Sequence, residues 1–80
     1  MTDSILRLPA VKTSTGLSRS TLYLRVAQGE FPKPVSLGGR AVGWPASEVA
    51  ALNAARIAGK SNAEIRDLVV KLEVARKAVA

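Results

Sequence analysis

The stretch "FPKPVSLGGRAVGWP", residues 31–45, decides between a plain helical hairpin and a winged fold. Its two prolines hold the chain extended and exclude a helix. The short runs "VSL" and "AVGW" have β-forming composition, and Gly38-Gly39 between them is a two-residue turn signal that tolerates positive φ values. We therefore expect a β-hairpin that pairs residues 35–37 with residues 41–44 and has an arginine near its tip.

Upstream of this hairpin, the sequence predicts two short helices joined by a tight turn. Pro9 suits the first turn of a helix, and Gly16 offers the left-handed conformation that ends it. Ser18 is placed to cap a second helix over residues 18–28, which stops at Gly29. Two such helices are common in plain helical hairpins, but a β-hairpin directly after them is a wing. The combination favours a winged helix-turn-helix.

Downstream, helical periodicity returns twice. The first of these helices starts at Pro45 or Ser47 and closes at Gly59, with an inward stripe of Val49, Leu52 and Ile57. The second opens on a capping box between Ser61 and Glu64. Its apolar positions repeat at helical spacing and are Ile65, Leu68, Val69, Leu72 and Val79.

The last helix has two interpretations. Its stripe packs on the domain's own core, or it pairs with a second copy of the chain. Because the stripe is narrow, we favour a homodimer through Ile65, Leu68 and Leu72, which would let one module read two half-sites. Trp44 and Phe31 are expected to fill the core at the ends of the hairpin.

Charge points to a polyanionic partner. The 80 residues make one small domain with 12 Lys and Arg against 6 Asp and Glu, a net charge of +6 and a pI near 10.6. Residues 1–45 hold six basic and two acidic side chains, whereas residues 46–80 hold six and four. The excess is therefore concentrated in the half that contains the two short helices and the hairpin. Nucleic acid is the commonest partner for such a surface.

The composition also excludes several classes of function. Cysteine and histidine are both absent, so the chain has no disulfide framework, no zinc site of the usual kind and no Cys- or His-based catalytic group. The six acids are scattered, and "GGR" is too short for a nucleotide-binding loop. We expect no enzyme activity, cofactor or metal. No run is long and apolar enough for a membrane span, and the N-terminus does not read as a signal peptide, so we expect a cytoplasmic protein.

The predicted second helix, residues 18–28, presents a face without a carboxylate. Leu22 and Val26 are spaced to point to the core, which leaves the opposite face to Ser20, Leu24 and Ala27. Such a face suits a helix that approaches phosphates and bases closely. Arg19 lies at the N-terminal end, where base edges are normally approached, and we expect it to contact a phosphate or a guanine.

Five further residues are candidates for DNA contacts, and three of them have two interpretations. Ser20 and Thr21 either donate to phosphate oxygens or cap the helix locally. Tyr23 either stacks on a sugar or a thymine methyl, or packs half-buried against the hairpin. Lys33, held between two prolines, loses little backbone entropy on binding a phosphate. Arg40 at the hairpin tip can enter a narrow, A·T-rich minor groove.

From Leu6 to about Ala58 the sequence resembles the AlpA family of prophage-type regulators, within the broader MerR-like winged-helix and excisionase group. The landmarks are "LRLP", "TGLSRSTLY", "GEFPKPV", "LGGRAVGW" and "SEV", in the order expected. The resemblance implies a helix-turn-helix with a short wing that binds duplex DNA. It places the second helix in the major groove, where it presents Arg19, Ser20, Tyr23 and Leu24.

Together these patterns predict a mainly α fold with a small β-hairpin, a MerR-like winged helix-turn-helix plus a C-terminal helix. Residues 1–58 would form the DNA-binding domain and residues 59–80 the helix for packing or self-association. We expect a sequence-specific double-stranded DNA-binding transcriptional regulator of a mobile element, bacterial or phage-encoded and nucleoid-associated. Helix 18–28 would read the major groove and the 32–44 wing would clamp the backbone.

Two alternatives stay open on the sequence. The same module would also serve an excisionase that bends DNA at an attachment site. A regulator of transcription would have RNA polymerase as its protein partner, and an excisionase would have a recombinase. A protein-interaction adaptor, such as an anti-repressor that grips its partner with the long last helix, is an alternative of another class.

Overall fold

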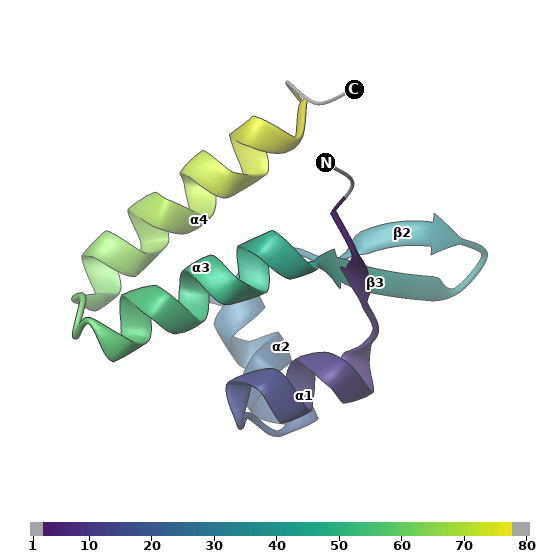
Figure 1. The fold of residues 1–80 in the computed structure, drawn as a ribbon, viewed down its shortest axis with the longest axis horizontal. Coiled ribbons are helices and arrows are strands. Elements are labelled where there is room, and N and C mark those ends of the chain that lie inside the picture. Colours follow the sequence, from purple (N-terminus) through teal and green to yellow (C-terminus); the bar gives the residue numbers. More distant parts are fainter. Residues whose placement is uncertain (1–2, 78–80) are drawn as a thin grey trace.

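A computed structural model describes residues 3–77 (Figure 1). Along the chain the elements are β1 (Ile5–Leu6), α1 (Leu8–Thr15), α2 (Arg19–Ala27), β2 (Val35–Gly38), β3 (Ala41–Pro45), α3 (Ala46–Ile57) and α4 (Asn62–Lys77). The strands form one antiparallel sheet in the order β1-β3-β2. The β2–β3 hairpin projects to one side of the helices (Figure 1). The predicted mainly α fold with a hairpin and a C-terminal helix is confirmed.

The two short helices begin and end for the local reasons that the sequence indicates. Gly16, at φ 73°, ends α1 in the left-handed conformation, and its N–H donates to the carbonyl of Lys12. Ser18 is the N-cap of α2, and its hydroxyl accepts the N–H of Thr21 at 3.3 Å. Gly29 follows α2 with φ 76°. Only the three residues 16–18 separate the helices, which brings them together as a helix-turn-helix pair.

The hairpin forms where it is predicted, but its turn lies one residue later. Ser36 is opposite Val42 and Gly38 is opposite Ala41, so β2 carries a bulge and Gly38 belongs to the strand. The turn is therefore Gly39-Arg40, which corrects the expected Gly38-Gly39 turn. Because a bulge adds one residue to one strand, it moves the tip along the chain without changing which segments pair.

The strand β1 was not expected from the sequence. Ile5 and Leu6 pair antiparallel with Pro45 and Trp44, which makes β3 the central strand. The close approach depends on Gly43, since a Cβ there would lie 2.5 Å from Cγ2 of Ile5 and 2.9 Å from the carbonyl oxygen of Leu6. A two-residue strand has no periodicity to detect, so only the folded chain reveals it.

Trp44 lies at the centre of the core and is fully buried, as predicted. Tyr23 and Phe31 each meet its indole edge-to-face, with ring centroids 6.1 Å away. The indole N–H donates to the carbonyl of Pro32 at 2.8 Å, so the one polar atom of the tryptophan side chain has a partner. The buried apolar residues around it are Val11, Leu22, Phe31, Val49, Leu52, Ile65 and Val69.

The structure corrects two expectations about the last two helices. Ile57, predicted to face inward, is 87% exposed because α3 ends there, beyond the reach of the core. Ile65 is fully buried in the chain's own core, so it cannot form the expected dimer contact. Leu68 and Leu72 are half-buried against the same core, and Val79 lies outside the described residues.

The predicted capping box at the start of α4 is confirmed. The N–H of Ser61 donates to the carboxylate of Glu64 at 3.1 Å, and the N–H of Glu64 donates to the hydroxyl of Ser61 at 3.2 Å. From there α4 runs back along α3 (Figure 1). The helix is thus part of the folded core and not an appendage.

Candidate nucleic-acid interface

The exposed side of α2 is uncharged except for a basic N-terminal end. Arg19, Ser20 and Leu24 are exposed, as are Ala27 and Gln28, whereas Leu22 is fully buried. This is the division between faces that the sequence predicts. Leu24 keeps 55% of its surface accessible, and no part of α2 carries an acid.

Ser20 and Thr21 belong to a cluster of hydroxyls at the cap of α2. The hydroxyl of Ser18 donates to that of Thr21 at 3.0 Å and lies 3.3 Å from that of Ser20. Thr21 is half-buried and Ser20 is exposed. Thr21 therefore takes part in the local capping cluster, and Ser20 is accessible on the face that contains Leu24.

Tyr23 lies between the core and the exposed end of α2. One edge of its half-buried ring packs against Trp44. The guanidinium carbon of Arg19 lies 5.7 Å from the ring centroid, within the range of a cation–π contact. The tyrosine therefore packs against the core, as one interpretation predicts, and also supports the Arg19 side chain.

The two basic candidates of the wing are both exposed, but their backbones are held differently. Arg40 lies in the turn between β2 and β3. Lys33 lies in the connector between α2 and β2, where its N–H donates to Glu73 at 2.9 Å and its carbonyl accepts from Arg76 at 2.8 Å. Its main chain is therefore fixed by α4, while no ion pair among residues 3–77 uses its side chain.

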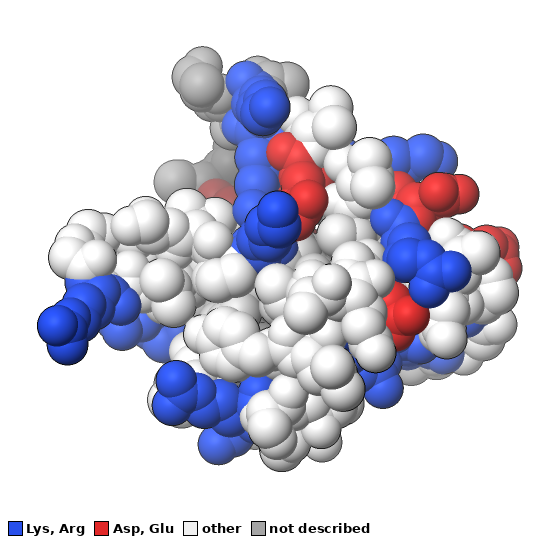
Figure 2. Space-filling view, turned by 180° about the vertical axis from the view of Figure 1, so that it is seen from behind, with Lys and Arg blue, Asp and Glu red and all other residues white. Residues whose placement is uncertain are grey.

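The acidic side chains near this basic surface come from neighbouring segments, and Glu73 of α4 accepts the N–H of Lys33 at 2.9 Å. Neither α1, α2 nor the hairpin contains an Asp or a Glu. Figure 2 brings α2, which is distant in Figure 1, to the front; its lower left shows Lys and Arg without any acid. Glu30 lies between α2 and the hairpin, and its carboxylate is only 13% exposed and is paired with Arg66 at 3.0 Å and Arg56 at 3.7 Å. The field of the basic residues is therefore little weakened there.

The sequence gives no indication of a buried ion pair beneath the wing. Glu48 is only 5% exposed, and its carboxylate accepts two hydrogen bonds from Arg76, at 2.5 and 2.8 Å. The hydrogen bond from Arg76 to Glu48 raises the pKa of this arginine further above its already high value. The sequence does not reveal this pair because its two residues are 28 positions apart. An acid in the first turn of a helix is also explained by its favourable interaction with the helix dipole.

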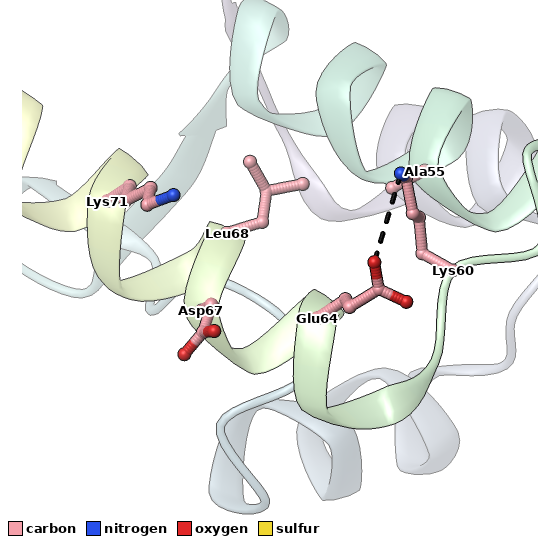
Figure 3. Close-up of a pocket in the computed structure, with 6 residues that line it drawn as sticks. All are labelled: Ala55, Lys60, Glu64, Asp67, Leu68 and Lys71. Carbon is pink, nitrogen blue, oxygen red and sulfur yellow. Dashed lines mark ion pairs between the residues drawn. The ribbon is translucent and has the colours of Figure 1, made fainter.

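A hollow of about 320 Å³ lies on the surface between α3 and α4 (Figure 3). Its charged rim is mixed, and Lys60 pairs with Glu64 at 3.9 Å, while Leu68 points toward α3. Nothing in it pairs a nucleophile with a base. Within residues 3–77 no group of three or more acidic side chains is placed to hold a metal ion. No helix in that part of the chain is long and apolar enough to cross a bilayer.

Comparison with known proteins gives two matches. Residues 4–57 match the family model described as "Prophage CP4-57 regulatory protein (AlpA)". The chain is also 53% identical over 58 residues to an uncharacterized protein, ORF88, of Enterobacteria phage P4. That alignment covers 72% of this chain and 66% of the relative. The family match includes both short helices, the hairpin and α3, and it ends before α4.

Proposed function

The chain belongs to the AlpA family of prophage regulatory proteins, and from this premise we propose that it is a sequence-specific double-stranded DNA-binding regulator of transcription. In this proposal α2 lies in the major groove of a MerR-like winged helix-turn-helix. The hairpin and its connector, residues 32–44, clamp the phosphate backbone.

One observation carries the proposal. On the exposed face of α2 and on the hairpin every charged side chain is basic. Of the acids close by, Glu30 is paired with two arginines, and the carboxylate of Glu73 accepts the N–H of Lys33. A surface that only keeps a protein in solution has no reason to segregate its charges in this way. A surface that meets DNA does, because a free carboxylate within a Debye length of the phosphates opposes binding.

The roles follow from position and chemistry. Arg19 at the start of α2 would reach base edges, with its guanidinium supported by Tyr23. Ser20 and Leu24, four residues apart, would follow it into the groove, where the leucine suits a thymine methyl. Lys33 and Arg40 would contact phosphates or the adjacent minor groove.

The direct test is the salt dependence of binding to duplex DNA, with a selection of bound sequences from random duplexes. A regulator with about six phosphate contacts loses affinity steeply as salt rises, and the selection converges on one motif. Binding that is absent at low salt, or that does not change with salt, would contradict the proposal and favour a protein-interaction adaptor.

The two groups of residues have separate signatures. Arg19→Ala should weaken specific binding by about 1–3 kcal/mol and relax preference at one or two base pairs, whereas Arg40→Ala should weaken all sequences evenly and lower the salt slope by about one unit. Both substitutions remove one positive charge, so each controls for the other. The opposite pattern would reverse the assignment of reader and clamp.

Footprinting separates regulation from excision. A single protected site over a promoter favours the regulator, with RNA polymerase as the protein partner. An array of sites with bent DNA at an attachment site favours the excisionase, with a recombinase as the partner.

A further inference from the structure

The connector between α2 and β2 is held by contacts along its whole length. It begins at Glu30 and runs through Phe31 and Pro32, both buried, to Lys33. On the core side the indole of Trp44 donates to the Pro32 carbonyl. On the side away from the core, the side chains that pair with Glu30 or bind the main chain of Lys33 come from α3 and α4.

Helix α4 contacts the connector at two places. Near its start, Arg66 pairs with the carboxylate of Glu30 and lies against Gly29, with its aliphatic carbons 3.9 Å from where a glycine Cβ would be. Near its end, Glu73 accepts the N–H of Lys33, and Arg76 donates to the Lys33 carbonyl. From Arg66 to Arg76 the helix advances by ten residue steps, about 15 Å, along the connector.

The contact that Arg76 makes with the connector is itself fixed. The same guanidinium that donates to Lys33 forms the two hydrogen bonds to the buried Glu48 at the start of α3. A bidentate arginine–carboxylate pair restricts both position and orientation. Arg76 is thereby held in an orientation in which Nη2, besides its bond to Glu48, also donates to the carbonyl of Lys33.

We propose that α4 is a positioning element for the DNA-binding surface, in which Glu73 and Arg76 fix the main chain of Lys33 so that its ammonium is presented to the phosphate backbone. This role rests on the proposed DNA-binding function. It also assigns a purpose to a helix that lies outside the family match, and it makes Glu73, an acid, favourable for binding a polyanion.

The experiment uses the fact that charge and positioning predict opposite effects of Glu73 on DNA binding. Glu73→Met and Glu73→Gln remove the same negative charge and have similar length, but only glutamine keeps an oxygen that can accept the N–H of Lys33. Electrostatics alone predicts that both variants bind DNA more tightly than the wild type. Positioning predicts that Glu73→Met binds about 2- to 10-fold more weakly than Glu73→Gln, the value of one hydrogen bond.

Binding is measured with the full chain and a fluorescein-labelled mixed-sequence duplex, because a phosphate contact does not depend on sequence. The same pair of variants is then made in a Lys33→Ala background. Since the helix acts through the lysine, the difference between Met and Gln should vanish there and the salt slopes should coincide. Equal binding of the two variants, or a difference that survives without the lysine, would overturn the positioning role.

Thermal unfolding followed by circular dichroism checks that each variant is folded at the assay temperature. Should Glu73→Met melt below it, Arg76→Lys takes its place, with Lys71→Arg on the same helix as the charge-conserving control. Arg76→Lys keeps a positive charge that can neutralise Glu48 but loses the guanidinium that also holds the connector, so this variant should weaken binding only while Lys33 is present. If the wild type itself shows no salt-dependent binding, the proposed function fails. If the wild type binds and the matched variants do not differ, only the positioning role fails.

Discussion

The indole N–H of Trp44 should account for a measurable share of stability. Trp44→Phe keeps an aromatic ring in the core but leaves the buried carbonyl of Pro32 without its donor, which costs about 1–3 kcal/mol. The smaller ring adds about 1 kcal/mol for the vacated volume. The expected loss is therefore about 2–4 kcal/mol. A domain of this size has on the order of 4–12 kcal/mol in total, so the variant should remain folded at low temperature.

The assay is urea unfolding followed by far-UV circular dichroism, because the variant lacks the fluorescent reporter. The midpoint should fall by about 1–2 M with an unchanged slope. Tyr23→Phe is the matched control. It keeps the ring against the tryptophan and removes only a hydroxyl, so it should lose less than about 0.5 kcal/mol.

A loss below about 1 kcal/mol in Trp44→Phe would refute the reasoning, since the hydrogen bond and the vacated volume would then both be compensated by relaxation. A change in slope instead of midpoint would mean that the substitution altered the unfolded or native ensemble. In either case the tryptophan would not be what anchors the connector to the core.

Three further predictions concern local geometry. Gly43→Ala should destabilise the fold by about 1–3 kcal/mol in thermal unfolding, since its Cβ would lie 2.5 Å from Ile5 and would push β1 off β3; wild-type stability would show that β1 is dispensable. Ser18→Ala should cost about 1 kcal/mol and Ser18→Gly only a few tenths, and equal losses would rule out the cap. Hydrogen bonds from Ser61 lower the pKa of Glu64, so the stabilisation that the Glu64 carboxylate provides is present above the ordinary glutamate pKa and is lost as the pH falls through the lowered pKa. In an NMR titration the chemical shift of the Ser61 amide should follow the protonation of Glu64, and in Glu64→Gln it should show no such step.

How much of the site could be predicted depends on whether its geometry is local. The exposed face of α2 follows from a period of 3.6 residues, and the prominence of Arg40 follows from the turn beside it. The internal pairing of Glu30 does not, because its two arginines lie 26 and 36 residues further along the chain. The basic character of the surface was visible in composition, but the pairing of the neighbouring acid Glu30 with two arginines was not.

Most helix and strand positions, and most of their ends, follow from local sequence patterns. Caps and turns are formed by residues within four positions of one another, so Ser18, Gly16 and the Ser61–Glu64 box act before any tertiary contact exists. The single tryptophan could be assigned to the core because a chain with three aromatic residues has few others to fill it.

The contacts that join these helices and strands, in contrast, depend on the tertiary structure. The pairing of β1 with β3 depends on a glycine that lets two backbones approach, and no periodicity marks it. The sequence left two packing modes open for α4, because a narrow apolar stripe fits the core of a partner and the chain's own core equally well. The favoured dimer contact through Ile65 was wrong, since this residue is buried in the chain's own core. The contacts of Glu73 and Arg76 with Lys33 span 40 and 43 residues, and chain folding alone brings such groups within hydrogen-bond distance.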